Sequence, residues 1–187
     1  CILYRFGERA LEAKQAILAT LSSTDTREVT GKKRLQKILR LAKSAGYKID
    51  ADYSIRQFGP FSNDIAYGAD LLAITGQIEE QERQLGAAGF FTTVYSLPHD
   101  TRSPIDVSSD FRDLIRFLDR YTTVELEVAS TIGHFLDMDY ELKKSVHKTK
   151  ELKPSKTKGA ILEKAKEIVE QITSSKEKVA QIRSTGS

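Results

Sequence analysis

The sequence predicts a mainly α, α+β protein with a winged helix-turn-helix-like N-terminal domain and a helical C-terminal region. Over residues 8–97 the predicted order is helix, short strand, helix, extended segment, helix and β-hairpin, which is the order of a winged helix. Residues 98–107 contain two prolines and are typical of a linker. Over residues 108–183 the apolar residues recur only at helical intervals.

The elements of the first half follow from local patterns. Apolar residues at helical spacing between Leu11 and Leu21 predict the first helix, and Glu28-Val29 predicts a very short strand. Thr30 is expected to cap a second helix that ends at Gly46. Residues 53–58 alternate in polarity and predict an extended segment, which Gly59-Pro60 interrupts.

The predicted N-terminal domain closes with a helix and a hairpin. Ser62 is expected to cap a third helix that Gly76 ends. Two strand-like runs, residues 77–84 and 90–97, flank a glycine-containing turn and predict a β-hairpin.

Four helices are predicted beyond the linker. Ser108 is expected to cap the first, and the Thr122–Glu125 spacing matches a capping box that begins the second, which runs to about Met138. A lysine-rich helix over 139–152 ends near Pro154, and the last helix runs from about residue 155 to 182.

The last helix has a heptad pattern of apolar residues, which predicts a homodimer contact. The alternative is an amphipathic helix that docks on the preceding helices of its own chain. The predicted dimerisation residues are Ile161, Ala165, Ile168, Ile172, Val179 and Ile182.

The second helix carries the only concentrated charge pattern. Residues 30–48 contain seven lysines and arginines and no acid, and Lys33, Lys37 and Arg40 share one helical face opposite the apolar stripe. Such a face can neutralise the phosphates of double-stranded DNA, although a solvated helix face has the same pattern. The predicted phosphate-binding residues are Lys32, Lys33, Arg34, Lys37 and Arg40.

The third helix is where a helix-turn-helix protein contacts bases, and its outward residues Asn63 and Tyr67 are the candidate readers. However, no lysine or arginine lies between Ser62 and Gln77, and the hairpin contains Glu79, Glu80 and Glu82. Carboxylates at these positions would repel phosphates, so this helix and hairpin favour a protein partner over DNA.

Two segments resemble a known family. The run Gly31-Lys-Lys-Arg-Leu-Gln-Lys37, followed by Phe58-Gly-Pro-Phe-Ser62, resembles the bacterial and archaeal YwgA family. A looser similarity is to the Panacea domain of SocA-like antitoxins, which pairs a Leu-Gln-Lys helix with a Gly-Pro turn. The resemblance covers roughly residues 30–80 and implies a winged-helix-like fold without an enzymatic activity; the Panacea similarity implies action through protein contacts.

Composition and spacing leave few sites for catalysis. The three histidines lack metal-ligand spacing to one another, and we recognise no phosphate loop or nucleophile motif. The sequence therefore predicts no enzymatic activity, no metal and no cofactor. A single cysteine, a net charge of +3 and the lack of an apolar run of about 20 residues predict a cytoplasmic protein without a membrane partner.

Two functions remain after these exclusions. The leading function is that of a non-enzymatic DNA-binding protein, predicted to be a transcriptional regulator that uses a winged helix, and the second is its alternative. The second is a protein–protein interaction module, antitoxin-like or adaptor-like, built on the same scaffold. The basic second helix favours the first function, and the acidic hairpin favours the second.

Overall fold

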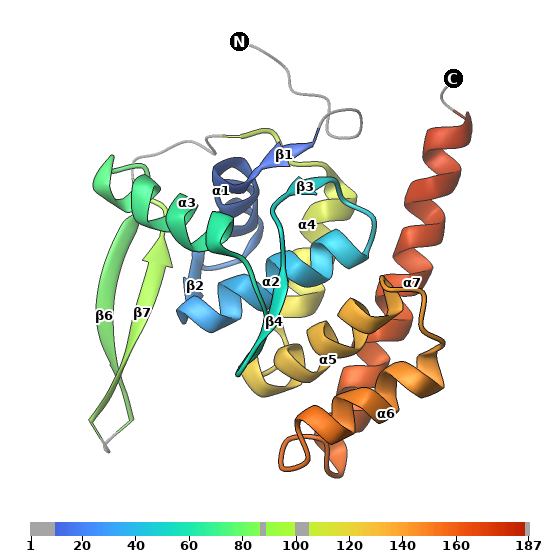
Figure 1. Ribbon diagram of the computed structural model, residues 1–187. Helices are drawn as coiled ribbons and strands as arrows, with labels where there is room; N and C mark the ends of the chain where they lie inside the picture. Colours follow the sequence, from blue (N-terminus) through green and yellow to red (C-terminus); the bar gives the residue numbers. More distant parts are fainter. Residues whose placement is uncertain (1–9, 87–88, 100–104, 186–187) are drawn as a thin grey trace.

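A computed structural model describes residues 10–86, 89–99 and 105–185, with side chains through residue 177 (Figure 1). The elements before the predicted linker are β1 (Leu11–Glu12), α1 (Ala13–Ser23), β2 (Glu28–Thr30), α2 (Lys32–Ser44), β3 (Ile49–Asp50), β4 (Ser54–Arg56), β5 (Gly59–Phe61), α3 (Asn63–Ile74), β6 (Glu79–Leu85) and β7 (Phe90–Ser96). Those after it are α4 (Ser109–Asp119), α5 (Thr123–Leu136), α6 (Leu142–Leu152) and α7 (Ala160–Thr185). The α+β class with mainly helical content is confirmed.

The largest sheet has three antiparallel strands in the order β2-β7-β6. Val29 of β2 lies opposite Tyr95 of β7, and Gln81 of β6 lies opposite Val94. The predicted short strand and hairpin therefore form one sheet, in which β6 is an edge strand whose side chains are all exposed.

Two small sheets were not predicted from the sequence. β1 pairs in parallel with β3, and β4 pairs with β5 in a tight antiparallel hairpin. The predicted extended segment over residues 53–58 contains β4, but its pairing with β5 was not predicted. The other strands have only two or three residues, too few for an alternating pattern to indicate them.

Most predicted caps are confirmed. The Ser62 and Ser108 hydroxyls accept hydrogen bonds from the backbone N–H groups of Ile65 and Phe111. Thr122 and Glu125 form the predicted capping box. The predicted cap at Thr30 is wrong by one residue, because the N-cap of α2 is Gly31 with a φ of +108°.

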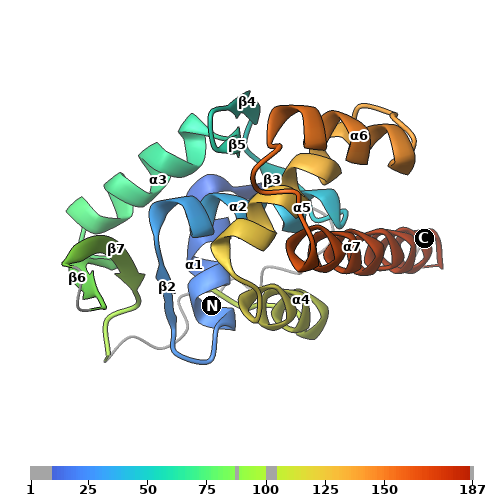
Figure 2. The same cartoon turned by 90° about the horizontal axis from the view of Figure 1, so that it is seen from below.

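The central element of the fold is α2, which contacts α1, α4, α5 and α7. Residues on both sides of the predicted linker share one hydrophobic core, which includes Leu39 of α2, Leu126 of α5 and Ile168 of α7. Figure 2 shows α2 between α1 and α5, and every residue of α2 from Leu35 to Ala42 is buried. A helix packed on several sides cannot keep a continuous polar face in water.

The heptad pattern of α7 is used within the chain. Ala165, Ile168 and Ile172 are buried in the shared core, and Ile161 is half-buried against it. The prediction that Ala165, Ile168 and Ile172 face a second copy is therefore wrong, because α5 packs on this seam. For the half-buried Ile161 it stays a prediction. The predicted dimerisation residues Val179 and Ile182 lie outside the described side chains.

Within the described residues, no helix combines the length and hydropathy that a membrane span requires.

Candidate functional site: a groove between the hairpin and α2

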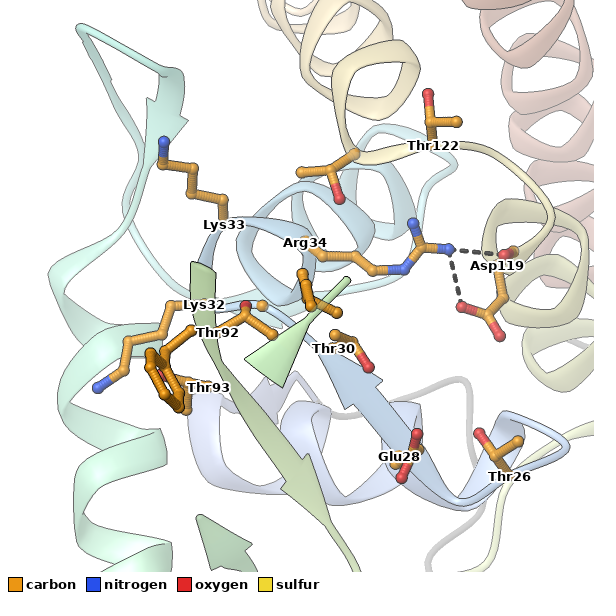
Figure 3. A pocket seen from close by; sticks show the side chains of 14 residues that line it. Thr26, Glu28, Thr30, Lys32, Lys33, Arg34, Thr92, Thr93, Asp119 and Thr122 are labelled. Atoms are coloured by element: carbon orange, nitrogen blue, oxygen red, sulfur yellow. Dashed lines mark hydrogen bonds and ion pairs between the residues drawn. The ribbon is translucent and has the colours of Figure 1, made fainter. Parts of the chain in front are cut away.

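An open groove of about 770 Å³ separates the β6–β7 hairpin from the first turn of α2 and the corner between α4 and α5 (Figure 3). This volume lies within the usual range for ligand pockets. The lining combines three basic residues, two carboxylates, two apolar residues and several threonines. The residues that line it are Thr26, Glu28, Thr30, Gly31, Lys32, Lys33, Arg34, Leu85, Phe91, Thr92, Thr93, Asp119, Thr122 and Thr123.

The end of the hairpin supplies the apolar wall of the groove. Leu85 and Phe91 line it, and Phe90 follows directly from the turn. Phe90 and Phe91 are 72% and 66% exposed, and Leu85 is 48% exposed. Leaving side chains of this size in water is unfavourable unless another surface covers them, so they indicate a binding surface.

The first turn of α2 supplies the basic part of the groove. Gly31 has no side chain to cap the helix, but its N–H donates to the carbonyl of Thr93 and so fixes the turn to β7. Lys32 forms an ion pair with Glu80 at 2.8 Å, and its pKa is raised chiefly by the hydrogen bond to that carboxylate. The Lys33 ammonium lies 3.3 Å from the centre of the Phe58 ring.

The Arg34 side chain forms its hydrogen bonds with the corner between α4 and α5. Its guanidinium donates to the carbonyl oxygens of Tyr121 and Asp119, both at 2.6 Å, and to the Asp119 carboxylate at 2.9 Å (Figure 3). The Asp119 carbonyl lies in the last turn of α4, where helix geometry leaves carbonyls without partners within the helix, and Tyr121 follows just after the helix ends. Arg34 therefore connects α2 to α4 and offers little to an external phosphate.

The rest of the predicted cationic strip lies inside the protein, and the prediction that it faces solvent is wrong. Lys37 is 2% exposed and donates to the Pro60 carbonyl at 2.5 Å. Arg40 is 4% exposed and pairs with Asp137 at 2.9 Å. Both are covered because β5 and α5 pack on the face of α2 that the sequence pattern assigned to water.

These contacts give the two family-like segments a structural role. The Gln36 side-chain amide donates to the Ser62 carbonyl and accepts from the Ser62 N–H, at 2.9 and 3.0 Å. Together with the bond from Lys37 to Pro60, these bonds join the Leu-Gln-Lys part of α2 to the Gly-Pro turn. The two segments therefore form one structural unit, which a run of sequence cannot show.

A buried ion cluster lies beneath this turn. The Glu127 carboxylate of α5 pairs with Lys153 at 2.5 Å and with Lys156 at 2.9 Å, and both Glu127 and Lys153 are buried. Although burial opposes ionisation, the two lysines hold the pKa of Glu127 below its usual value. Sequence analysis missed this cluster because Glu127 of α5 lies far along the chain from the segment that carries Lys153 and Lys156.

The charges of this cluster act electrostatically on the buried Lys37. Burial lowers its pKa to about 8, with the Glu127 charge opposing the shift and the neighbouring lysine charges adding to it. An unfolded lysine titrates near 10.5, so at pH values between the two the unfolded chain binds more protons than the folded one.

Stability should therefore rise with pH in this window. We expect the free energy of unfolding to increase from about pH 8 towards pH 10, by up to roughly 1.4 kcal/mol per pH unit. The increase should be absent from Lys37→Met. Urea unfolding of both proteins across this range measures it, and parallel pH profiles would contradict the burial of a charged Lys37.

The candidate base-reading residues lie on α3 and do not line the groove. Asn63 and Tyr67 are exposed, as the helical pattern predicted. Asn63 accepts a hydrogen bond from Arg56 at 3.0 Å, and the Tyr67 side chain is 70% exposed. Their base-reading role remains a prediction.

Among the described residues, no group of three or more histidine, cysteine, aspartate or glutamate side chains has the geometry of a metal site.

Comparison with known proteins places one relative beside this chain. The chain is 28% identical over 125 residues to the Bacillus subtilis (strain 168) protein named "Uncharacterized protein YwgA". The aligned region covers 65% of this chain and 74% of the relative, which supports the resemblance to the YwgA family. No family model and no solved structure matches the chain.

Proposed function

We propose that this chain is a non-enzymatic protein–protein interaction module built on a winged-helix scaffold. The order α1, β2, α2, α3, β6, β7 and the sheet order β2-β7-β6 support the scaffold. The short β3, β4 and β5 strands form the long connection between its second and third helices.

The observation that carries the proposal is the exposed apolar end of the hairpin. Leu85 and Phe91 line a groove whose other walls offer threonine hydroxyls, three basic side chains and the carboxylates of Glu28 and Asp119, and the neighbouring Phe90 is also exposed at the hairpin end. Aromatic side chains next to hydrogen-bonding groups are typical of the centre of protein interfaces. A partner segment with apolar side chains would cover the hairpin end and exchange hydrogen bonds with the threonines.

Charge supports a protein partner over DNA. In the predicted phosphate-binding set, Lys37 and Arg40 are internal, and Lys32 and Arg34 already pair with carboxylates. The surface of α3 and β6 exposes further carboxylates, at Asp64, Asp70, Glu79 and Glu82. Binding of a duplex to this side would bring phosphates towards negative charge and would be unfavourable.

Co-purification of the full chain from its own cells tests the proposal. We expect a protein partner in stoichiometric amount with the wild type and at least about tenfold less with the double variant Phe90→Ser and Phe91→Ser, because the hairpin anchors are then lost. Met138→Ser with Leu152→Ser is the matched control, since both side chains are exposed elsewhere. The control should keep the partner.

Duplex binding at low salt separates the two functions. We expect no change in the fluorescence anisotropy of a labelled duplex. Salt-sensitive binding that is weakened by Lys33→Ala would contradict the proposal and favour a nucleic-acid partner. Equal recovery of the partner with the hairpin variant and the wild type would place its binding surface elsewhere.

A further inference from the structure

One side of the molecule carries opposite charges at its two ends. Figure 2 shows α3, the β4–β5 hairpin and α6 along the same side, in that order. The α3 sequence contains two aspartates and no lysine or arginine, whereas α6 contains four lysines, a histidine and a single glutamate. This side is therefore acidic at α3 and basic at α6.

The acidic end also exposes apolar side chains. Tyr67 and Ile74 are two helical turns apart on α3 and are 70% and 83% exposed. Asp70 lies between them in the sequence and is exposed as well. The outer surface of α3 is thus an acidic amphipathic face with nothing from the described chain covering it.

The basic end is hollowed. A groove of about 740 Å³ lies between α6 and α7. Its apolar part is formed by Leu142 and Val146. Four lysines, at positions 143, 144, 150 and 166, outnumber the two glutamates that also line it, at 141 and 170, so the groove is basic on balance. Lys143 and Lys150 are two turns apart, the same spacing as Tyr67 and Ile74 on α3.

We propose that a second copy of this chain covers this side, with α3 of each copy seated in the α6–α7 groove of the other. A two-fold axis that passes through the side near the β4–β5 hairpin brings each acidic end onto a basic end, so one rotation satisfies both contacts. With 12 and 11 residues, α3 and α6 are similar in length.

Apolar contacts fit the same arrangement. Tyr67 and Ile74 would cover Leu142 and Val146, while Asp70 would lie among the lysines at the border of the groove. Near the axis, Ile55 and Phe58 of the β4–β5 hairpin are 36% and 40% exposed and would meet their own symmetry mates. This interface replaces the one that the heptads of α7 predicted, and it leaves the β6–β7 hairpin free.

Charge reversal tests the dimer. The full chain should sediment at about twice its mass of 21.0 kDa. Two variants should each sediment as monomers. The α3 variant is Asp70→Lys with Ile74→Lys, which places lysines against the lysines of the groove and removes an apolar contact. The groove variant is Lys143→Glu with Lys150→Glu, which places carboxylates against Asp70. Circular dichroism checks that both variants remain folded.

Mixing the two variants is the decisive step. An equimolar mixture should recover a dimer. One of its two contacts joins the unchanged α3 to the unchanged groove, and in the other contact the new lysines of α3 attract the new glutamates of the groove. A monomeric wild type, a variant that remains dimeric, or a mixture that remains monomeric would overturn the proposal. The hairpin variant, Phe90→Ser with Phe91→Ser, should remain dimeric, so the dimer and the function proposed for the hairpin can fail separately.

Discussion

Replacing Glu127 with glutamine is expected to lower the free energy of unfolding by about 3–5 kcal/mol. Its carboxylate pairs with Lys153 and Lys156 and opposes the charge of the buried Lys37. Without it, three lysines close to one another lose their shared counter-charge, and water cannot readily replace it because Lys37 and Lys153 are buried. Chemical denaturation measures the loss.

Glu163→Gln is the matched control for this variant. Glu163 pairs with Lys166 on the exposed surface of α7, so the same substitution should cost less than about 1 kcal/mol. Adding Lys153→Met to Glu127→Gln should recover part of the lost stability, because it removes one unpaired buried charge. Equal losses in the Glu127 and Glu163 variants would show that the cluster does not have the described burial.

Gly59→Ala is expected to destabilise the protein by about 3 kcal/mol or more. The φ of Gly59 is +83°, which disfavours a residue with a Cβ, and an added Cβ would lie only 2.8 Å from the Thr131 hydroxyl. That hydroxyl donates to the Glu127 carbonyl within α5, so moving it disturbs the helix that bears the buried carboxylate. Thermal and chemical unfolding measure the change.

Gly76→Ala separates the backbone cost of a positive φ from the steric cost of the added Cβ. Gly76 also has a positive φ, of +69°, but an added Cβ there meets no heavy atom within 4 Å. Only the backbone cost of about 1–2 kcal/mol should remain. Gly59→Ala in a Thr131→Ala background should lose less stability than in the wild type. A Gly59 variant no less stable than the Gly76 variant would contradict the close approach of the turn to α5.

The helices and the main hairpin could be predicted because their signals are local. The capping box at Thr122 and Glu125 and the cap at Ser62 depend on residues three positions apart, and the structure keeps them. The heptads of α7 also identified a real apolar seam, although its partner is α5 of the same chain. Periodicity reveals that a face is buried but does not reveal what buries it.

The fate of the basic residues of α2 could not be predicted in the same way. The spacing of Lys33, Lys37 and Arg40 predicts a solvated face only if one side of α2 is free. In the folded protein these residues interact with residues far along the chain. Lys37 interacts electrostatically with Glu127, and Arg40 forms an ion pair with Asp137. The Leu-Gln-Lys segment and the Gly-Pro turn could be recognised in the sequence, but the hydrogen bonds that join them could not.

Native-state acetylation of lysines, read by mass spectrometry, tests the placement of α2 most directly. Lys33 and Lys37 belong to one helix and lie four residues apart. We expect rapid modification of the exposed Lys33 and strong protection of Lys37, with both reacting alike after denaturation. Equal reactivity of the two lysines in the folded protein would contradict the buried connection between α2 and the Gly-Pro turn. It would support the sequence-based prediction that the basic residues of α2 face solvent.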